Sequence, residues 1–276
     1  MPYRIRSHVS EGSGVFGTRE DTPSSVIPTI EIGPFPISDV TTDDLVDLIV
    51  QDATGRAIDQ PAVVYALHVG GLNEYQNLDY INAIRAGDLV YADGMAVVAL
   101  ARIAGAKHIQ RAPTTDLGWK VIEELQKDKG RPIRLAIVGG PEGLAQRAGL
   151  EIQRRLGSEI VFTTHGYHDE WSAVLDQLSR QDFDLLLIGM GMPTEALWCR
   201  QHAKSLPPAV VMTCGGWLGF IVGDERRAPR WMRTAGLEWV FRLMLAPKRL
   251  GNRYARGLAT CLKLLVPALT QRYRSR

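Results

Sequence analysis

We expect the 276-residue chain to form an α/β fold, a mostly parallel sheet flanked by helices, followed by a basic amphipathic helical C-terminal appendage. Two observations predict this. Short apolar runs alternate with helix-like segments between residues 62 and 213, and several of these runs lack the polar alternation of half-exposed strands. Residues 226–276 differ, because they combine dense positive charge with helical apolar periodicity.

Six short apolar runs, several rich in Val, Ile and Leu, are the strand candidates. They are Ala62–Leu67, Leu89–Ala92, Arg134–Val138, Ile160–Thr163, Leu185–Ile188 and Val210–Thr213. Helix candidates lie between them, near 77–86, 94–104, 115–127, 142–156, 169–180 and 195–205. Regular structure is expected to begin near Thr29, and a capped helix to follow near 41–49. Repeated strand–helix alternation is typical of a parallel sheet with helices on both faces.

The chain divides into three parts by composition. Residues 1–27 are rich in Ser, Gly, Thr and Pro and are predicted to be disordered, while residues 28–225 form the α/β domain and residues 226–276 the appendage. The three cysteines are widely spaced, which favours neither a disulfide framework nor a zinc knuckle. No apolar run resembles a signal peptide or approaches the roughly 20 residues of a spanning helix, so we expect a cytoplasmic protein.

The charge is unevenly distributed. Residues 226–276 hold 13 Lys or Arg and a single acid, Glu238, whereas the preceding residues hold 19 basic and 29 acidic side chains. Apolar residues recur with helical spacing within 236–246 and within 255–270, which predicts two amphipathic helices with basic polar faces. Such helices fit in-plane binding to an anionic membrane surface. Docking onto the α/β body, a solvated tail and an oligomer contact are the alternatives.

Two glycine-rich segments follow strand candidates. Gly139 and Gly140 follow one strand and open a helix, and Gly189 and Gly191 follow another. Ligands of open parallel sheets bind beyond the carboxyl ends of the strands, and glycines there let the backbone approach a phosphate. The same glycines also suit plain tight turns. Position 194 is Thr, so the full dinucleotide fingerprint is absent, as is a Walker A sequence.

Several polar residues lie at strand ends. Asp93 ends the strand 89–92, where a carboxylate serves either as a general base or as a helix cap. His68 follows the strand 62–67, but no second ligand lies at metal-binding spacing. The Asp182-Phe183-Asp184 segment resembles a metal-binding D-x-D motif, yet it precedes its strand and is interpreted as a surface turn. We expect neither a metal nor a cofactor.

The ordered set of motifs resembles a known family. From about residue 29 to 256, the chain is similar to bacterial glycosyltransferases that elongate undecaprenyl-diphosphate-linked sugars, the WecG/TagA/CpsF family. The matching motifs are Ala92–Gly94, Gln110–Arg111, Asp116–Leu117, Val138–Gly140, His165–Tyr167, Gly189–Pro193, Arg227–Trp231, Gly236–Leu243 and Pro247–Arg249. The strongest of these begins at Arg227, which we group with the substrate-binding candidates.

The resemblance implies a Rossmann-like, inverting and metal-independent transferase on the inner face of the cell membrane. It would move a sugar (of the N-acetylmannosamine type, a hexose or a uronate) from a UDP-sugar onto a lipid-diphosphate-linked sugar. The pathway would be cell-surface polysaccharide synthesis, such as that of an exopolysaccharide. Asp93 matches the family's general base, and Arg111 matches an active-site arginine. Arg242 and Arg249 match tail arginines that reach toward the diphosphate, and Arg253 lies close to a further one.

Three departures from the family pattern lie beside the expected pocket. The segment from Tyr65 to Gly71 replaces the usual Thr-x-Asn, which makes Tyr65 and His68 substrate-binding candidates. Glu195 stands where Gln is usual, and Gly219 stands where many relatives have Asp. These departures leave the donor and acceptor sugars open. Glu195 is also a second carboxylate that competes with Asp93 for the role of base.

Two other classes of protein are alternatives. A nucleotide-dependent oxidoreductase is favoured only by the glycine-rich strand ends, and no evident acidic ribose partner follows about 20 residues on. A non-enzymatic protein that binds membrane or nucleic acid would use the basic tail, but it leaves Asp93 and Arg111 unexplained. We therefore expect sugar donor, lipid acceptor and membrane as partners, and not nucleic acid. A homo-oligomer stays open.

Overall fold

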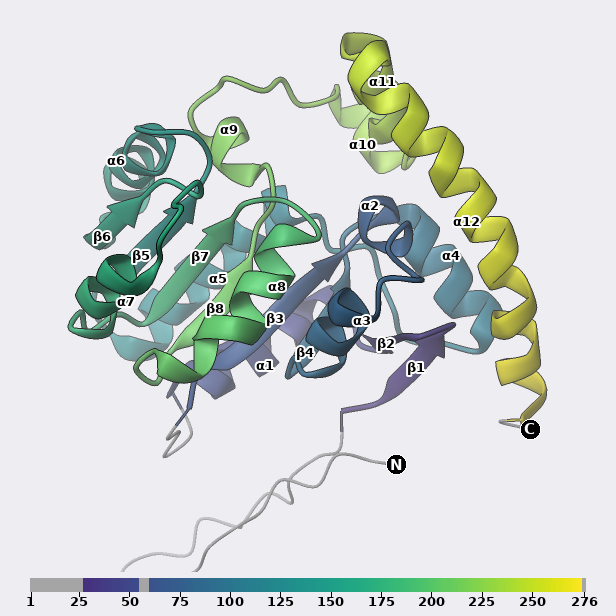
Figure 1. Cartoon of the computed structure of the whole chain (residues 1–276), viewed down its shortest axis with the longest axis horizontal. Helices are drawn as coiled ribbons and strands as arrows, with labels where there is room; N and C mark the ends of the chain where they lie inside the picture. Colours follow the sequence, from purple (N-terminus) through teal and green to yellow (C-terminus); the bar gives the residue numbers. More distant parts are fainter. Residues whose placement is uncertain (1–26, 55–59, 275–276) are drawn as a thin grey trace, which may run out of the picture.

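The computed structural model describes residues 27–54 and 60–274. The predicted disorder of residues 1–27 concerns a segment that, apart from Ile27, lies outside the described residues. The described chain forms an α/β fold with a six-stranded parallel sheet in the order β4-β3-β8-β7-β5-β6 (Figure 1). The predicted fold class is therefore confirmed.

The strands lie close to their predicted positions. They are β3 (Ala62–Leu67), β4 (Leu89–Ala92), β5 (Arg134–Gly139), β6 (Glu159–Thr164), β7 (Leu185–Gly189) and β8 (Val210–Thr213). Within β3, residues of opposite parity enter opposite cores, since successive side chains of a strand point to opposite faces. Tyr65 and Leu67 belong to one core, and Val64 and Ala66 to the other. Both faces are covered, which explains why this strand reads as a continuous apolar run.

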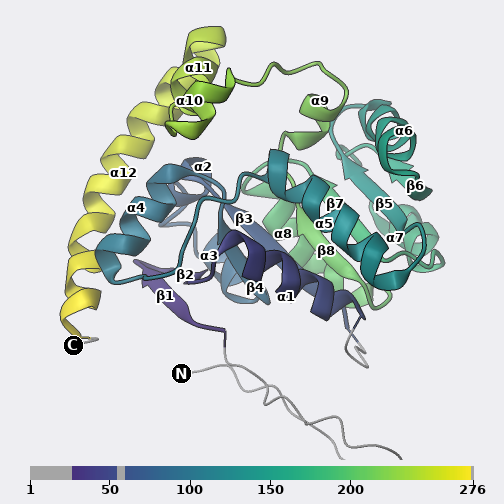
Figure 2. The ribbon, with the colours of Figure 1, turned by 180° about the vertical axis from the view of Figure 1, so that it is seen from behind.

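Helices cover both faces of the sheet, as Figures 1 and 2 show from opposite sides. Helices α3 (Leu78–Arg85), α4 (Met95–Ala104), α7 (Ser172–Ser179) and α8 (Thr194–His202) contribute to one core. Helices α1 (Thr42–Thr54), α5 (Thr114–Lys129), α6 (Leu144–Leu156) and α9 (Trp217–Ile221) contribute to the other. The short α2 (Val69–Leu72) follows β3 directly, and a 3₁₀ turn, Ala203–Ser205, follows α8.

A separate two-stranded hairpin precedes the six-stranded sheet. Strands β1 (Thr29–Ile32) and β2 (Phe35–Ser38) pair in antiparallel register around Gly33, whose φ is 59°. A Cβ added at Gly33 would lie 2.6 Å from Cδ2 of Leu264, so the turn and the C-terminal helix are in close contact.

The C-terminal segment differs in part from its prediction. It forms α10 (Arg230–Thr234), α11 (Glu238–Leu245) and one long helix, α12 (Pro247–Arg274), which is longer than the predicted 255–270. Helix α12 continues past Pro267, although a proline removes one helical hydrogen bond. Packing compensates, because the inner face of α12 lies along α4, α2 and β1 (Figures 1 and 2). The buried residues of that face are Leu250, Gly257, Thr260, Leu264 and Ala268. Among the described helices, α12 included, none is long and apolar enough to cross a membrane.

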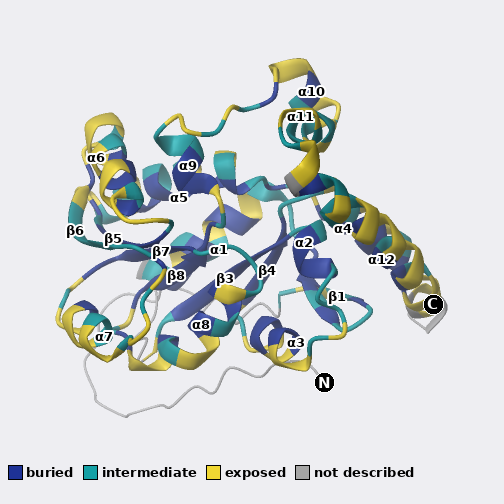
Figure 3. Ribbon diagram, turned by 45° about the horizontal axis from the view of Figure 1, so that its top comes forward, coloured by how far each residue is buried: buried dark blue, intermediate teal, exposed yellow. Residues whose placement is uncertain are grey.

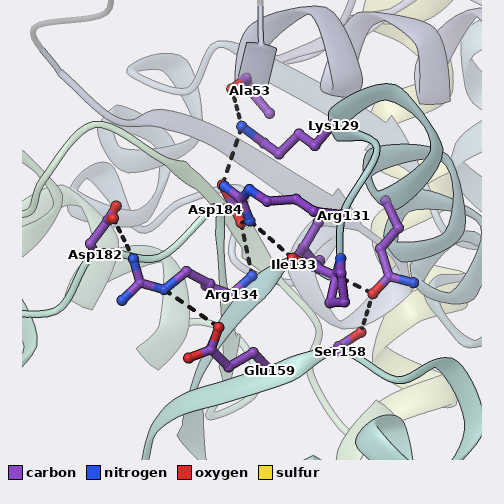
Figure 4. A network of polar contacts seen from close by, with 11 residues as sticks. Ala53, Lys129, Arg131, Ile133, Arg134, Ser158, Glu159, Asp182 and Asp184 are labelled. Atoms are coloured by element: carbon purple, nitrogen blue, oxygen red, sulfur yellow. Dashed lines mark hydrogen bonds and ion pairs between the residues drawn. The ribbon is translucent and has the colours of Figure 1, made fainter.

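The amino end of the sheet is closed by an ion-pair network (Figure 4). Asp184 is buried and accepts hydrogen bonds from the Arg131 guanidinium at 2.8 and 2.9 Å and from the Arg134 backbone N–H at 2.8 Å. Its carboxylate also lies 3.2 Å from Lys129 Nζ, while Asp182 is exposed and pairs with Arg134. Both acids of the D-x-D segment are thus engaged by basic side chains at the edge opposite the candidate site.

Candidate active site

The carboxylate of Asp93 is held in place at the carboxyl end of β4. Its Oδ1 accepts hydrogen bonds from the backbone N–H of Thr114 at 2.7 Å and from Thr114 Oγ1 at 2.8 Å. Thr114 is the first residue of α5, so the helix N-terminus stabilises the negative charge. Among the described residues, Asp93 Oδ2 has no hydrogen-bond donor, which leaves this oxygen available for a proton.

His68 lies at the end of the neighbouring strand β3 and caps α2. Its Nδ1 accepts the backbone N–H of Gly70 at 2.9 Å. Burial lowers the pKa of His68 to about 4; the Asp93 charge opposes this shift, and the charges of Arg253 and Arg242 reinforce it. The imidazole is therefore neutral near pH 7. Because Nδ1 accepts a hydrogen bond, the proton is on Nε2, which makes His68 a neutral donor beside Asp93.

Two arginines of the appendage reach this group. The Arg253 guanidinium lies against α2: a Cβ added at Gly70 would be 2.3 Å from its Nη2, so the arginine is in close contact with the backbone that follows His68. Arg242 lies over the Phe220 ring at 5.5 Å and 3.6 Å from Glu225. Both arginines act electrostatically on His68, which places their charges near the ends of β3 and β4. The side chain of Arg249, in the first turn of α12, lies outside the described part of the chain.

Arg111 and Arg227 join the α/β body to the appendage. Arg111 donates to Glu238 Oε2 at 2.6 Å and to the Arg233 carbonyl at 3.1 Å. Arg227 binds Asp116 in a bidentate pair at 2.7 and 2.9 Å, and its Nε lies 3.9 Å from Glu238. From Arg111 through Glu238 and Arg227 to Asp116, these contacts form a chain in which arginines alternate with acids. Helices α10 and α11 are thereby fixed beyond the carboxyl ends of β3 and β4 (Figures 1 and 3).

Glu195 is buried and braces two strand-end loops. Its Oε2 accepts backbone N–H groups of Gly191 at 2.9 Å, Gly215 at 3.1 Å and Met190 at 3.3 Å. Burial raises the pKa of Glu195 to about 7, although these three hydrogen bonds oppose the shift. The side chain thus connects the loops after β7 and β8.

The candidate glycines bring strand ends into close contact. A Cβ on Gly139 would lie 2.3 Å from the Gly189 carbonyl oxygen, and the Gly140 N–H donates to that oxygen at 2.9 Å. Gly191 has a φ of 74°, a conformation that favours glycine. These contacts account for the glycines through backbone packing at the expected edge.

Tyr65 is not part of the group around Asp93. It is 1% exposed in the core between β3 and α8, and its hydroxyl lies 3.5 Å from the Ala196 carbonyl. Burial raises the pKa of this hydroxyl well above its ordinary value. Tyr65 was a candidate because its segment replaces the usual Thr-x-Asn. It lies in the expected strand, but both faces of β3 are buried and Tyr65 precedes the carboxyl end of the strand, so its side chain packs in the core.

Two residues at this edge of the sheet were not predicted from the sequence as partners of the site residues. Thr114, which holds Asp93, is separated from it by 21 positions, and only its place at a helix start gave a signal. Glu238 is the single acid of residues 226–276, and one acid among so many basic residues could have indicated a specific ion pair.

The carboxyl edge of the parallel sheet carries a fixed carboxylate, Asp93, with the charges of Arg242 and Arg253 nearby, an arrangement that suits group transfer from a phosphorylated substrate. The chain belongs to the WecG/TagA/CpsF family of glycosyltransferases, whose family model matches residues 30–276. Its general function is therefore glycosyl transfer in cell-surface polysaccharide synthesis. The oxidoreductase and the non-enzymatic alternatives are set aside by this match.

Proposed function

We propose that the protein transfers a sugar from a UDP-sugar to a sugar carried on undecaprenyl diphosphate, with inversion at the anomeric carbon. The observation that carries the proposal is the grouping of Asp93, His68, Arg242 and Arg253 at the ends of β3 and β4. The carboxylate supplies a base, and the cations supply a binding site for phosphate oxygens.

The reaction is a single displacement. The acceptor hydroxyl oxygen attacks the anomeric carbon from the face opposite UDP, and the bond between that carbon and the UDP oxygen breaks. Asp93 takes the hydroxyl proton, and UDP leaves with the bonding electrons. A positioned base of this kind contributes about 10²–10⁴-fold to the rate. Asp93 suits the role better than Glu195, whose Oε2 is occupied by three backbone N–H groups.

The leaving UDP is stabilised by arginine in this mechanism. Negative charge grows on the phosphate oxygens as the bond breaks, and guanidinium groups match these oxygens geometrically. Arg242 and Arg253 supply the two charges, and neutral His68 adds a hydrogen-bond donor. The proposed transfer thus proceeds without a metal ion. The donor is of the N-acetylmannosamine, hexose or uronate type.

The appendage, residues 226–276, is proposed to act also as the membrane contact. Its exposed large apolar side chains are Trp231, Leu237, Trp239, Met244, Leu245, Leu258, Leu262, Val266 and Leu269. Apolar side chains among basic residues favour in-plane binding to anionic lipid. The protein would then work as a peripheral protein on the inner face of the cell membrane, where one segment both touches lipid and completes the catalytic domain, residues 28–225.

Turnover tests the proposal directly. A panel of UDP-sugars is incubated with short-chain lipid-diphosphate-linked sugars, and UDP release and product mass are measured. We expect one donor–acceptor pair to give product, Asp93→Asn to abolish it, and a chelator to leave it unchanged. Absence of product with every pair, or full activity of Asp93→Asn, would contradict the proposal. A chelator effect reversed by a divalent ion would contradict its metal-free form.

A further inference from the structure

Two adjoining cavities lie at α10. The first, of about 370 Å³, lies between the beginnings of α4 and α5 and the appendage, and is lined by Met95, Arg111, Asp116, Arg230 and Arg233 among others. The second, of about 710 Å³, is shallower and is lined by Arg230, Trp231, Thr234 and Ala235. Arg230 and Thr234 line both, so the two cavities form one continuous surface.

The first cavity has an excess of positive charge. Its wall includes three guanidinium groups and one carboxylate, Asp116, which is already bound by Arg227. Arg111 is paired with Glu238, but the Arg230 guanidinium makes no ion pair with any residue in the described ranges. Four arginines and two acids in and around the cavity leave a net charge of two, which balances the two negative charges of a diphosphate diester.

Arg233 is held only weakly by the acid beside it. Within the described chain, Nε of Arg233 is buried and has no acceptor, although buried donors are normally paired. The ion pair between Arg233 and Asp116 is long, at 3.8 Å. Because that ion pair is long, the Nη groups of Arg233, rather than its enclosed Nε, can bind an anion in the cavity that Arg233 lines.

The second cavity adds an apolar surface beside the charges. Trp231 is 66% exposed and follows Arg230 directly in α10. A large aromatic side chain left in water next to a cationic pocket suits an amphiphile, with an anionic head in one cavity and an apolar chain along the ring.

We propose that the first cavity binds the diphosphate of the lipid-linked acceptor and that Trp231 contacts the first isoprene units of its chain. This inference rests on the proposed function. Met95 lines the cavity and lies two positions after Asp93, and Pro113 lines it directly before Thr114. A sugar attached to a diphosphate in this cavity therefore extends toward Asp93, while Arg242 and Arg253 serve the donor in the proposed mechanism.

Binding of farnesyl diphosphate to the full chain, measured by calorimetry without a sugar donor, tests the inference. A charge-assisted hydrogen bond contributes about 1.5–3 kcal/mol, so Arg230→Ala and Arg233→Ala should each weaken binding about tenfold or more. Trp231→Ala should weaken binding of farnesyl diphosphate but not of inorganic diphosphate. Arg256→Ala, which removes an exposed α12 arginine with the same change in charge, should leave both unchanged.

The outcomes separate this site from a lipid contact and from the proposed function. Equal effects of Arg230→Ala and Arg256→Ala would overturn the inference. So would variants that lose binding only to phosphatidylglycerol vesicles and keep farnesyl diphosphate, because α10 would then contact membrane headgroups. Since no sugar donor is present, the binding result does not depend on whether the protein turns over a UDP-sugar. Thermal unfolding of each variant verifies that it is folded.

Discussion

Thr114 binds the Asp93 carboxylate through both its backbone nitrogen, at 2.7 Å, and its hydroxyl, at 2.8 Å. The hydroxyl is shared with Tyr91, whose phenol oxygen lies 2.7 Å from Thr114 Oγ1. Because the Thr114 hydroxyl donates to Asp93, the tyrosine donates to the threonine. A buried chain of two hydroxyl groups thus orients the proposed base from inside the protein.

Replacement of Thr114 by valine tests whether this chain matters for catalysis. Thr114→Val keeps the shape and the backbone N–H, but it removes one hydrogen bond to Asp93 and leaves the Tyr91 hydroxyl without its acceptor. We expect kcat to fall about tenfold, the effect of roughly 1.4 kcal/mol in the barrier, with little change in KM. Tyr91→Phe is the control, since it spares the bond between Thr114 and Asp93. Equal losses in both variants would show that only packing is affected.

Glu195 should make stability fall as the pH rises. Its folded-state pKa of about 7 lies above the ordinary 4.5, so the folded protein binds the proton more tightly than the unfolded chain does. Stability is then lost between about pH 4.5 and 7, at about 1.36 kcal/mol per unit of pKa difference. Glu195→Gln cannot titrate and should show a smaller decrease, measured by urea unfolding at pH 5 and pH 8. Identical pH dependence in both proteins would contradict a raised pKa.

Glu195→Gln also separates the two candidate bases. A glutamine oxygen still accepts backbone N–H groups from the loops after β7 and β8, but it cannot take a proton. We expect this variant to retain turnover where Asp93→Asn does not. The reverse result would assign the base to Glu195.

The network at the amino end of the sheet should contribute strongly to stability. Burial alone would raise the pKa of Asp184, but hydrogen bonds from Arg131, the Arg134 backbone and Lys129 hold it below its ordinary value. Asp184→Ala removes the acceptor of several charged donors and should cost about 1.5–3 kcal/mol in unfolding free energy, since the half-exposed Arg131 can be solvated. Asp182→Ala, at a side chain 89% exposed, should cost less than about 1 kcal/mol.

The pH dependence of that difference provides a second measurement. A lowered carboxyl pKa contributes stability above the ordinary value of 3.8 that is lost as the pH falls through the folded-state pKa. The stabilities of wild type and Asp184→Ala should therefore converge in acid. A difference that stays constant down to pH 2 would assign the loss to packing.

The ion pair between Arg111 and Glu238 should hold the appendage on the body. Their side chains are 16% and 14% exposed, so Glu238→Ala would leave a largely buried guanidinium without its acid. We expect faster hydrogen exchange in α10 and α11 and unchanged exchange in β5 and β7. Glu151→Ala breaks an i,i+3 surface pair with Arg154 and is the control. Unaltered exchange in α11 would show that α12 alone anchors the appendage.

Local sequence patterns predicted most of the fold. The strands were found because two-sided burial leaves continuous Val, Ile and Leu runs, as in Leu185–Gly189. The extent of α12 was underestimated, since apolar periodicity indicated only residues 255–270 of a helix that runs from Pro247 to Arg274. For the site, chain position indicated Asp93 and His68, but the partners of Arg111 and Asp93 come from segments far along the chain. Tyr65 shows the limit most clearly, because it lies in the predicted strand but is buried in the core between β3 and α8.

Helix α12 has one face that packs on the domain and one face that is exposed. One side places Gly257 against Val69 and Leu264 against Gly33, while Leu258, Leu262 and Val266 emerge on the other. One additional residue in its first turn would rotate everything downstream by about 100°. The exposed apolar side chains would turn toward the domain, and Arg253 would move away from the ends of β3 and β4. The rotation of α12 about its axis therefore determines both which apolar side chains face the surroundings and whether Arg253 reaches the proposed reaction centre.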